Sequence, residues 1–163
     1  MNANKRQQGF SLIELLIVVA IIGIIAAIAI PNLLASRRAA NEGSAQQSLR
    51  TLSSAEATYQ ATSGNGNYAD LTGLGSGNLI DSVLAGGSKS GFTFNVTKAD
   101  AVVNTSAATF DGSAKPTITS GVSQTGTRRF CIDESGVLKA DPTVGSLGTT
   151  VADCGATGSA VGN

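Results

Sequence analysis

Histidine is absent from this 163-residue chain, which also has only two cysteines and only 4% aromatic residues. Without histidine, catalytic triads built on an imidazole base and metal sites built on imidazole ligands are excluded. Charged residues make up 13% of the chain, well below the usual share of about a quarter. The 11 basic residues balance 11 acidic ones, and they form no basic cluster of the kind that marks a nucleic-acid-binding protein.

Other catalytic and metal-binding motifs are missing as well. The segment Gly86–Gly91 reads GGSKSG and lacks the GxxxxGK[ST] spacing of a phosphate-binding loop. The glycines of Gly73–Gly77 lie outside the strand-to-helix context that a nucleophile elbow requires. Asp133 and Glu134 lack the further spaced acidic ligands of a calcium loop. We therefore predict no catalytic residue, no cofactor and no metal site.

The most informative segment is a long apolar run near the N-terminus, from Phe10 to Ile30. A bilayer core about 30 Å thick is spanned by roughly 20 apolar residues in a helix, which this run supplies. Glu14 interrupts it, and an unpaired carboxylate costs about 2.5 kcal/mol or more at the bilayer centre. An ionisable residue inside a membrane segment is a functional-site hypothesis by default.

A chain cut between Gly9 and Phe10 would supply a partner for this carboxylate. Phe10 would then carry a free α-amine, which is cationic near neutral pH. In an assembly of identical helices, the amine of one subunit can neutralise Glu14 of the next. Because leaving either charge alone in a poorly solvated site is costly, such a pair would fix the register between subunits.

The sequence from Lys5 to Leu15, KRQQGFSLIEL, resembles the class III signal of type IV prepilins and of type II secretion pseudopilins. The resemblance implies that a prepilin peptidase cleaves after Gly9 and methylates the new amine of Phe10. It also implies that Glu14 guides the addition of subunits to a filament.

On this resemblance we expect the structural subunit, and specifically the major pilin, of a type IV pilus-like filament. Its implied partners are copies of itself, the prepilin peptidase and methyltransferase, an inner-membrane assembly platform, and the lipid bilayer before assembly. Nucleic acid would bind only as cargo of the filament. The precursor would lie in the bacterial inner membrane and the assembled subunit at the cell surface. A pseudopilin and a minor pilin are the alternatives within the family.

Two other interpretations of the apolar run remain. A simple membrane anchor leaves Glu14 and the Gly9–Phe10 step unexplained. A secretory signal could be cleaved at Ala27–Ala29, although the run exceeds the usual 7–15 residues of such a signal. The protein would then be a secreted or anchored binding module. The mature N-terminus separates these cases, because the pilin begins at Phe10 and the module at Ile30.

We expect four segments along the chain. Residues 1–9 form a leader that is removed, and residues 10–31 form a transmembrane and filament-core helix. Residues 32–62 continue as an amphipathic helix, and residues 63–163 form a globular head. The resemblance places Gly23 and Pro31 where pilin helices bend or melt, and two separate helices broken at Pro31 are the alternative.

The amphipathic half shows an apolar stripe at helical spacing, and the charged residues are expected mainly off this stripe. The stripe consists of Ala45, Leu49, Leu52 and Tyr59, and the charged residues are Arg37, Arg38, Glu42, Arg50 and Glu56. The sequence SGNGN at residues 63–67 predicts the end of the helix, because glycine and asparagine tolerate the left-handed geometry of a C-cap.

The head is predicted to be mostly loop up to Ser90, with one helical turn near residues 78–84, and then strands. Alternation of apolar and polar residues predicts the strands, at 91–97, 107–115, 127–133 and 137–140. The last two resemble the final hairpin of type IVa pilin-like proteins. The expected fold is α+β, with an antiparallel sheet packed on the amphipathic half of the long helix.

The two cysteines, Cys131 and Cys154, form an even pair in a chain with an export signal, which predicts one disulfide. The closed loop would stabilise the fold by about 3–4 kcal/mol if the bond acts by restricting the unfolded chain. It would also hold the Gly- and Thr-rich C-terminal segment, whose composition otherwise predicts disorder.

Overall fold

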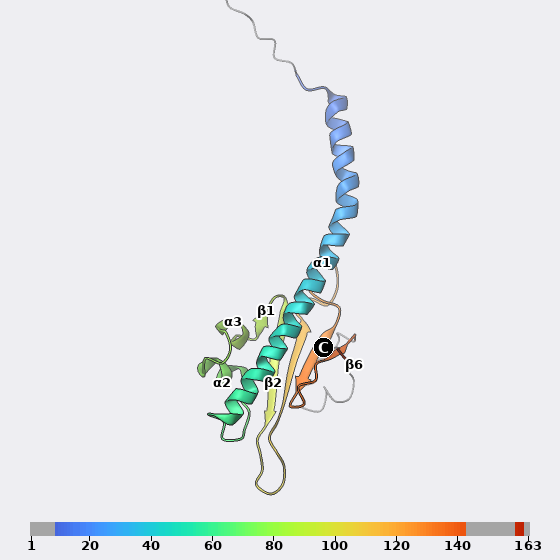
Figure 1. The fold of residues 1–163 in the computed structure, drawn as a ribbon. Helices are drawn as coiled ribbons and strands as arrows, with labels where there is room; N and C mark the ends of the chain where they lie inside the picture. Colours follow the sequence, from blue (N-terminus) through green and yellow to red (C-terminus); the bar gives the residue numbers. More distant parts are fainter. Residues whose placement is uncertain (1–8, 143–158, 162–163) are drawn as a thin grey trace, which may run out of the picture. The chain divides into compact units, whose positions relative to one another are not determined.

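The computed structural model describes residues 9–142 and 159–161 (Figure 1). The chain divides into one unit that ends at Ser36 and a second that begins at Arg37. Helix α1, Leu12–Ala61, contributes to both units. The other elements belong to the second unit; they are α2 (Leu71–Ser76), α3 (Ser82–Ala85), β1 (Ser88–Lys89), β2 (Phe92–Ala99), β3 (Thr109–Pro116), β4 (Arg129–Asp133), β5 (Lys139–Asp141) and β6 (Ser159–Ala160). The predicted α+β fold is confirmed.

Helix α1 continues through Pro31, so the alternative of two helices separated at that residue is wrong. Bending or melting at Gly23 and Pro31 stays a prediction. The helix ends where the sequence predicts, because Asn65 (φ 49°) and Gly66 (φ 90°) adopt left-handed geometry just beyond it. The amides of Ser63 and Gly64 donate to the carbonyl of Tyr59 at 3.0 and 2.7 Å, which satisfies the helix C-terminus.

In the second unit, the part of α1 from Arg37 onward lies across one face of the sheet (Figure 1). Its apolar stripe is buried as predicted, with Ala45, Leu49 and Leu52 fully covered. Two carboxylates differ from the expectation. Glu42 is 6% exposed and Glu56 is 0% exposed, so both lie on the covered face, and their placement off the stripe was wrong.

Within residues 9–142 and 159–161, the sheet has six antiparallel strands in chain order, from β1 to β6. Its longest pairing joins β2 to β3, from Phe92 opposite Pro116 to Ala99 opposite Thr109. The predicted strands correspond to β2, β3, β4 and β5, with bounds that differ by a few residues. Pro116 is the last residue of β3, so the strand ends at the proline that the sequence shows there. The two-residue strands β1 and β6 were not predicted.

The segment between α1 and β1 was expected to be mostly loop, but it contains the two short helices α2 and α3. An aspartate caps each N-terminus. Asp70 accepts from the amide of Gly73 at 2.7 Å, and Asp81 accepts from the amide of Leu84 at 2.9 Å. These caps satisfy amides that have no partner within so short a helix. Leu74 and Leu84 then reach the core, where both are fully buried.

Candidate functional site

The predicted processing and assembly residues lie at the start of α1. Gly9 and Phe10 precede the helix, and Glu14 lies in its first turn. The amide of Leu15 donates to the carbonyl of Ser11 at 3.2 Å, which begins the helical hydrogen-bond series. The first amides of a helix lack acceptors and carry partial positive charge, so a carboxylate in this turn is favoured by about 0.3–1 kcal/mol.

The first half of α1 presents apolar side chains on every face. Its large aliphatic residues other than the half-buried Leu34 are exposed. They are Leu12, Ile13, Leu15, Leu16, Ile17, Val18, Val19, Ile21, Ile22, Ile24, Ile25, Ile28, Ile30 and Leu33. The helix is long and apolar enough to cross a membrane, by length and composition. Because exposed apolar area costs roughly 25 cal/mol per Å² in water, this surface requires lipid or other protein around it.

Gly23 lies in the middle of this apolar surface. Among the residues that the structure describes, no atom lies within 4 Å of the position that a Cβ on Gly23 would take. Close packing against the rest of the described chain therefore does not require glycine at this position. Its predicted role in helix bending remains a prediction.

Glu42, on the covered face of α1, joins the helix to the segment before β4. Its Oε1 accepts from the amide and the hydroxyl of Thr127 at 2.7 and 2.8 Å. Its Oε2 accepts from Nε and Nη2 of Arg128 at 3.0 and 2.8 Å. Burial alone would raise the pKa of Glu42, but these hydrogen bonds and the arginine charge outweigh it and hold the pKa below its ordinary value.

Two further contacts fix the same segment to the preceding turn of α1. Arg38 donates to the side-chain oxygen of Gln124 at 3.0 Å. Asn41 donates to the backbone carbonyl of Thr125 at 3.0 Å. Together with Glu42 they attach the loop before β4 to one stretch of helix. This arrangement joins α1 to the sheet through polar contacts as well as through the apolar core.

Glu56 holds a different segment. Its Oε2 accepts from the amide of Ala69 at 2.9 Å, just before α2. Its Oε1 is buried and has no hydrogen-bond partner among the described residues. Burial in these surroundings raises the pKa of Glu56 to about 7; the nearby charge of Asp70 adds to the shift, whereas the Ala69 amide and Lys98 oppose it.

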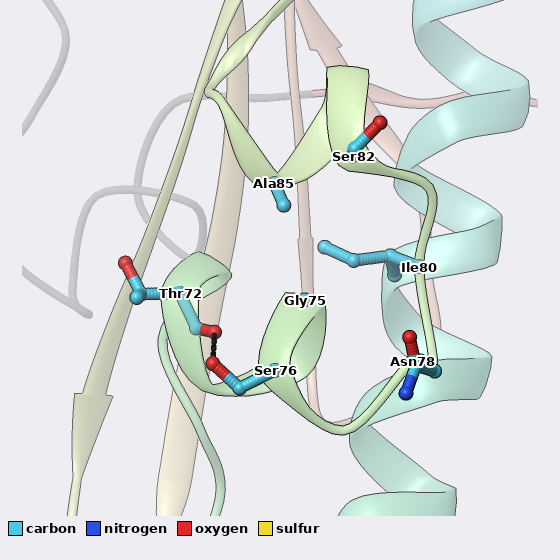
Figure 2. Close-up of a pocket in the computed structure, with 7 residues that line it drawn as sticks. All are labelled: Thr72, Gly75, Ser76, Asn78, Ile80, Ser82 and Ala85. Atoms are coloured by element: carbon cyan, nitrogen blue, oxygen red, sulfur yellow. Dashed lines mark hydrogen bonds between the residues drawn. The ribbon is translucent and has the colours of Figure 1, made fainter.

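A hollow of about 390 Å³ lies between α2 and α3. Figure 2 shows its lining, which combines hydroxyl and amide groups with the aliphatic side chains of Ile80 and Ala85. The hydroxyl of Ser76 donates a hydrogen bond to the backbone carbonyl of Thr72 at 2.8 Å. No lining residue carries a titratable side chain, so this hollow offers hydrogen bonds and apolar contact rather than acid–base chemistry.

Comparisons with known proteins match the start of the chain. The model of the prokaryotic N-terminal methylation motif matches residues 4–30. The type IV major pilin protein PilA of Myxococcus xanthus is 48% identical over 56 residues, which are 34% of this chain and 26% of that protein. The type IV wide pilus major component PilA4 of Thermus thermophilus is 44% identical over 73 residues, which are 44% of this chain and 56% of that protein. The first part of the chain is therefore similar to type IV pilins and carries their N-terminal methylation motif.

A component of a secretion system is also similar to the first part of this chain. The type II secretion system core protein G of Escherichia coli is 33% identical over 60 residues, which are 37% of this chain and 41% of that protein. The matches thus span between about a quarter and about half of the length of these relatives. No solved structure shows a significant match.

The other predicted site residues have mixed outcomes. Cys131 lies on β4, but Cys154 lies outside the described residues, so the disulfide stays a prediction. In the described part of the chain, no group of three or more metal-ligating residues is placed to hold an ion. The sequence analysis missed Glu42 and Glu56 as buried polar anchors. Their positions continue the spacing of the apolar stripe, and that spacing was the available signal.

Proposed function

We propose that this chain is the major subunit of a type IV pilus-like filament that polymerises through the first half of α1. The observation that carries the proposal is Glu14, a carboxylate in the first turn of a helix whose apolar side chains are exposed. The similarity of the first segment to two major pilus components supports it. A pseudopilin is the second candidate, because a type II secretion protein is also similar to this segment. A minor pilin remains the other alternative within the family.

Processing after Gly9 would create the cation that Glu14 requires. The prepilin peptidase would cleave there and methylate Phe10, leaving a terminal amine that remains cationic near neutral pH. That amine on one subunit would pair with Glu14 on its neighbour. A charge pair in an apolar surrounding contributes specificity more than net stability, so it would set the axial register of the helices.

The apolar surface of α1 would leave the lipid bilayer and become buried among other subunits. Before assembly, lipid would cover the residues from Phe10 to Pro31. In the filament, the same side chains would pack against copies of themselves, so extraction from the bilayer and polymerisation would be coupled. An inner-membrane assembly platform would drive this step, and nucleic acid would bind only as cargo.

The four expected segments then have separate tasks. Residues 1–9 would be the removed leader and residues 10–31 the membrane and core helix. Residues 32–62 would carry the head on the amphipathic half of the helix, and residues 63–163 would form the outer surface. The precursor would reside in the inner membrane and the product outside the cell.

The decisive experiment is recovery of sheared surface filaments from cells that express the chain, followed by mass spectrometry of its N-terminus. We expect long filaments whose subunit begins at a methylated Phe10. A subunit that retains the peptide bond after Gly9 would overturn the processing step. A soluble monomer that begins at Ile30 would favour the binding module. Correct processing with short periplasmic fibres only would favour the pseudopilin.

A further inference from the structure

The connection between α1 and α2, residues 62–70, is joined to the long helix in two ways. Its start, residues 62–66, is held by backbone hydrogen bonds to the last turn of α1, whereas Ala69 near its end is held by one buried carboxylate. Figure 1 shows this connection in green, between the end of α1 and the start of α2. Glu56 accepts from the amide of Ala69 at 2.9 Å, and both residues are covered, with 0% and 4% exposure. The contact therefore lies in the interior, where an unpaired charge is far more costly than a neutral carboxyl group.

The surroundings of Glu56 do not neutralise it. The charged groups whose fields reach it are Asp70, at the start of α2, and Lys98, on β2. The amine of Lys98 already donates to the carboxylate of Asp100 at 2.7 Å, and both side chains are exposed. Asp70 repels a second negative charge nearby. Within the described chain, Oε1 of Glu56 has no hydrogen-bond donor, so one amide is left to stabilise the ionised group.

The contrast with Glu42 shows what is missing. Glu42 lies on the same covered face of α1, but it accepts from a backbone amide, a hydroxyl and a guanidinium group. These donors therefore stabilise the ionised form of Glu42. The surroundings of Glu56 favour its neutral carboxyl form, because a single amide contact does not offset the cost of burying a full charge.

We propose that Glu56 makes the attachment of the Ala69 end of this connection to α1 depend on protonation. The neutral carboxyl group holds Ala69 against the helix, and loss of its proton weakens this attachment. The connection then opens locally while the sheet and the apolar core stay folded. Mildly acidic conditions thus favour the attached connection and alkaline conditions favour the released one. This inference does not depend on the proposed filament function.

The raised pKa of Glu56, about 7, sets the range in which the change is expected. In the open state the pKa of Glu56 returns to its ordinary value near 4.5. As the pH rises, the open state therefore loses the Glu56 proton before the attached state does. Attachment is therefore strongest at low pH and weakens as the pH rises through about 7. Between about pH 5.5 and pH 8.5 this linkage corresponds to a roughly 30-fold loss of protection of the Ala69 amide.

Amide hydrogen exchange of the full chain in detergent micelles tests the proposal, after correction for the intrinsic pH dependence of exchange. We expect the Ala69 amide to lose protection by roughly 30-fold between about pH 5.5 and 8.5, whereas amides of β2 and β3 change little. In Glu56→Gln, which keeps an acceptor but cannot ionise, the protection should be independent of pH. Equal profiles for the native chain and Glu56→Gln would overturn the proposal.

Two further measurements separate titration from a purely structural role. Asp70→Asn keeps a good helix cap but removes the neighbouring negative charge, so the transition should move to lower pH. Glu42→Gln should leave the transition unchanged. If Glu56→Gln does not fold, the carboxyl carbon of Glu56 can be titrated by NMR in the native chain. A midpoint near 7 that coincides with the change at Ala69 supports the proposal, and a midpoint near 4.5 overturns it.

Discussion

Oε1 of Glu42 lies 2.7 Å from the backbone nitrogen of Thr127, although 85 positions separate these residues in the sequence. The same carboxylate binds the guanidinium group of Arg128, which lies 5.5 Å from the ring centroid of Phe130. One side chain of α1 therefore fixes the start of β4 and orients an arginine over a core aromatic ring. The polar contact and the apolar core act at the same junction.

Replacing Glu42 with alanine should destabilise the head by about 1–2 kcal/mol, because the amide of Thr127 and the partly solvated guanidinium of Arg128 lose their acceptor. Urea unfolding of the full chain in micelles, followed by the near-ultraviolet signal of Tyr59 and Tyr68, measures this loss. Arg50→Ala, at an exposed position of the same helix, is the matched control and should change little. Equal stability of both variants would show that the Glu42 contacts contribute nothing.

The stabilising effect of the Glu42 charge should depend on pH. The folded pKa of Glu42 lies below its ordinary value, so its ionised form stabilises the fold above about pH 4.5 and loses this effect as the pH falls further. The difference in unfolding free energy between the native chain and Glu42→Gln should therefore be largest near neutral pH and shrink toward about pH 3. A difference that stays constant over this range would mean that the charge is not what matters.

Gly126, just before Thr127, should tolerate no side chain. A Cβ there would stand 2.6 Å from Cζ of Phe92 and 3.2 Å from Cγ of Pro116, and both residues are fully buried. Gly126→Ala should destabilise the fold by about 1–3 kcal/mol, because the Phe92 ring must shift within a packed core. Thermal unfolding of the full chain measures this.

Gly43 provides the matched control for that substitution. It lies at an exposed position of α1, with open space where a Cβ would stand. Gly43→Ala should stabilise the chain by up to about 1 kcal/mol through helix propensity. Similar effects of the two alanines would contradict the packing account of Gly126.

The parts of this molecule that the sequence predicts well are those with local signals. The apolar run lies in one continuous segment and forms the first part of α1, and the helix ends at the predicted glycines. The burial of Glu42 and Glu56 was missed because charge was given more weight than position. Both lie three or four residues from members of the apolar stripe, on the same face. The hydrogen-bond donors that meet these two buried side chains are the amides of Thr127 and Ala69. No local sequence pattern identifies donors so distant in the chain.

For a different reason, α2 was missed, and α3 was predicted only as a helical turn near residues 78–84. The many glycines of residues 71–87 lower helix propensity, so the segment was predicted to be mostly loop. The caps at Asp70 and Asp81 and the burial of Leu74 and Leu84 outweigh that propensity. Such packing energy comes from tertiary contacts, which a propensity argument does not include.

The predicted disulfide between Cys131 and Cys154 can be tested by peptide mapping of the unreduced chain, where a linked pair of peptides is expected. Replacing both cysteines with serine should cost about 3–4 kcal/mol of stability in the chain-entropy account. Adding a reductant to the native chain should cost a similar amount and leave the double variant unchanged. Two free thiols in the exported protein would contradict the prediction.

Glu14 provides the sharpest test of assembly. Glu14→Gln keeps the size and polarity of the side chain but removes the charge that the Phe10 amine of a neighbour would require. We expect normal membrane insertion and normal cleavage after Gly9, because the apolar run that spans the bilayer is unchanged. Filament yield should fall at least about tenfold, because each added subunit would leave its terminal amine without a counter-ion in an apolar core.

The measurement is the amount of subunit in the sheared filament fraction relative to the membrane fraction. Ser11→Ala, close to Glu14 in the sequence but without a charge change, is the control and should assemble normally. Because membrane insertion and cleavage are measured in the same cells, a loss of filaments in Glu14→Gln can be assigned to the polymerisation step. Filaments from Glu14→Gln in normal amount would show that the register depends on the apolar contacts alone, and the proposed charge pair would then have no role in assembly.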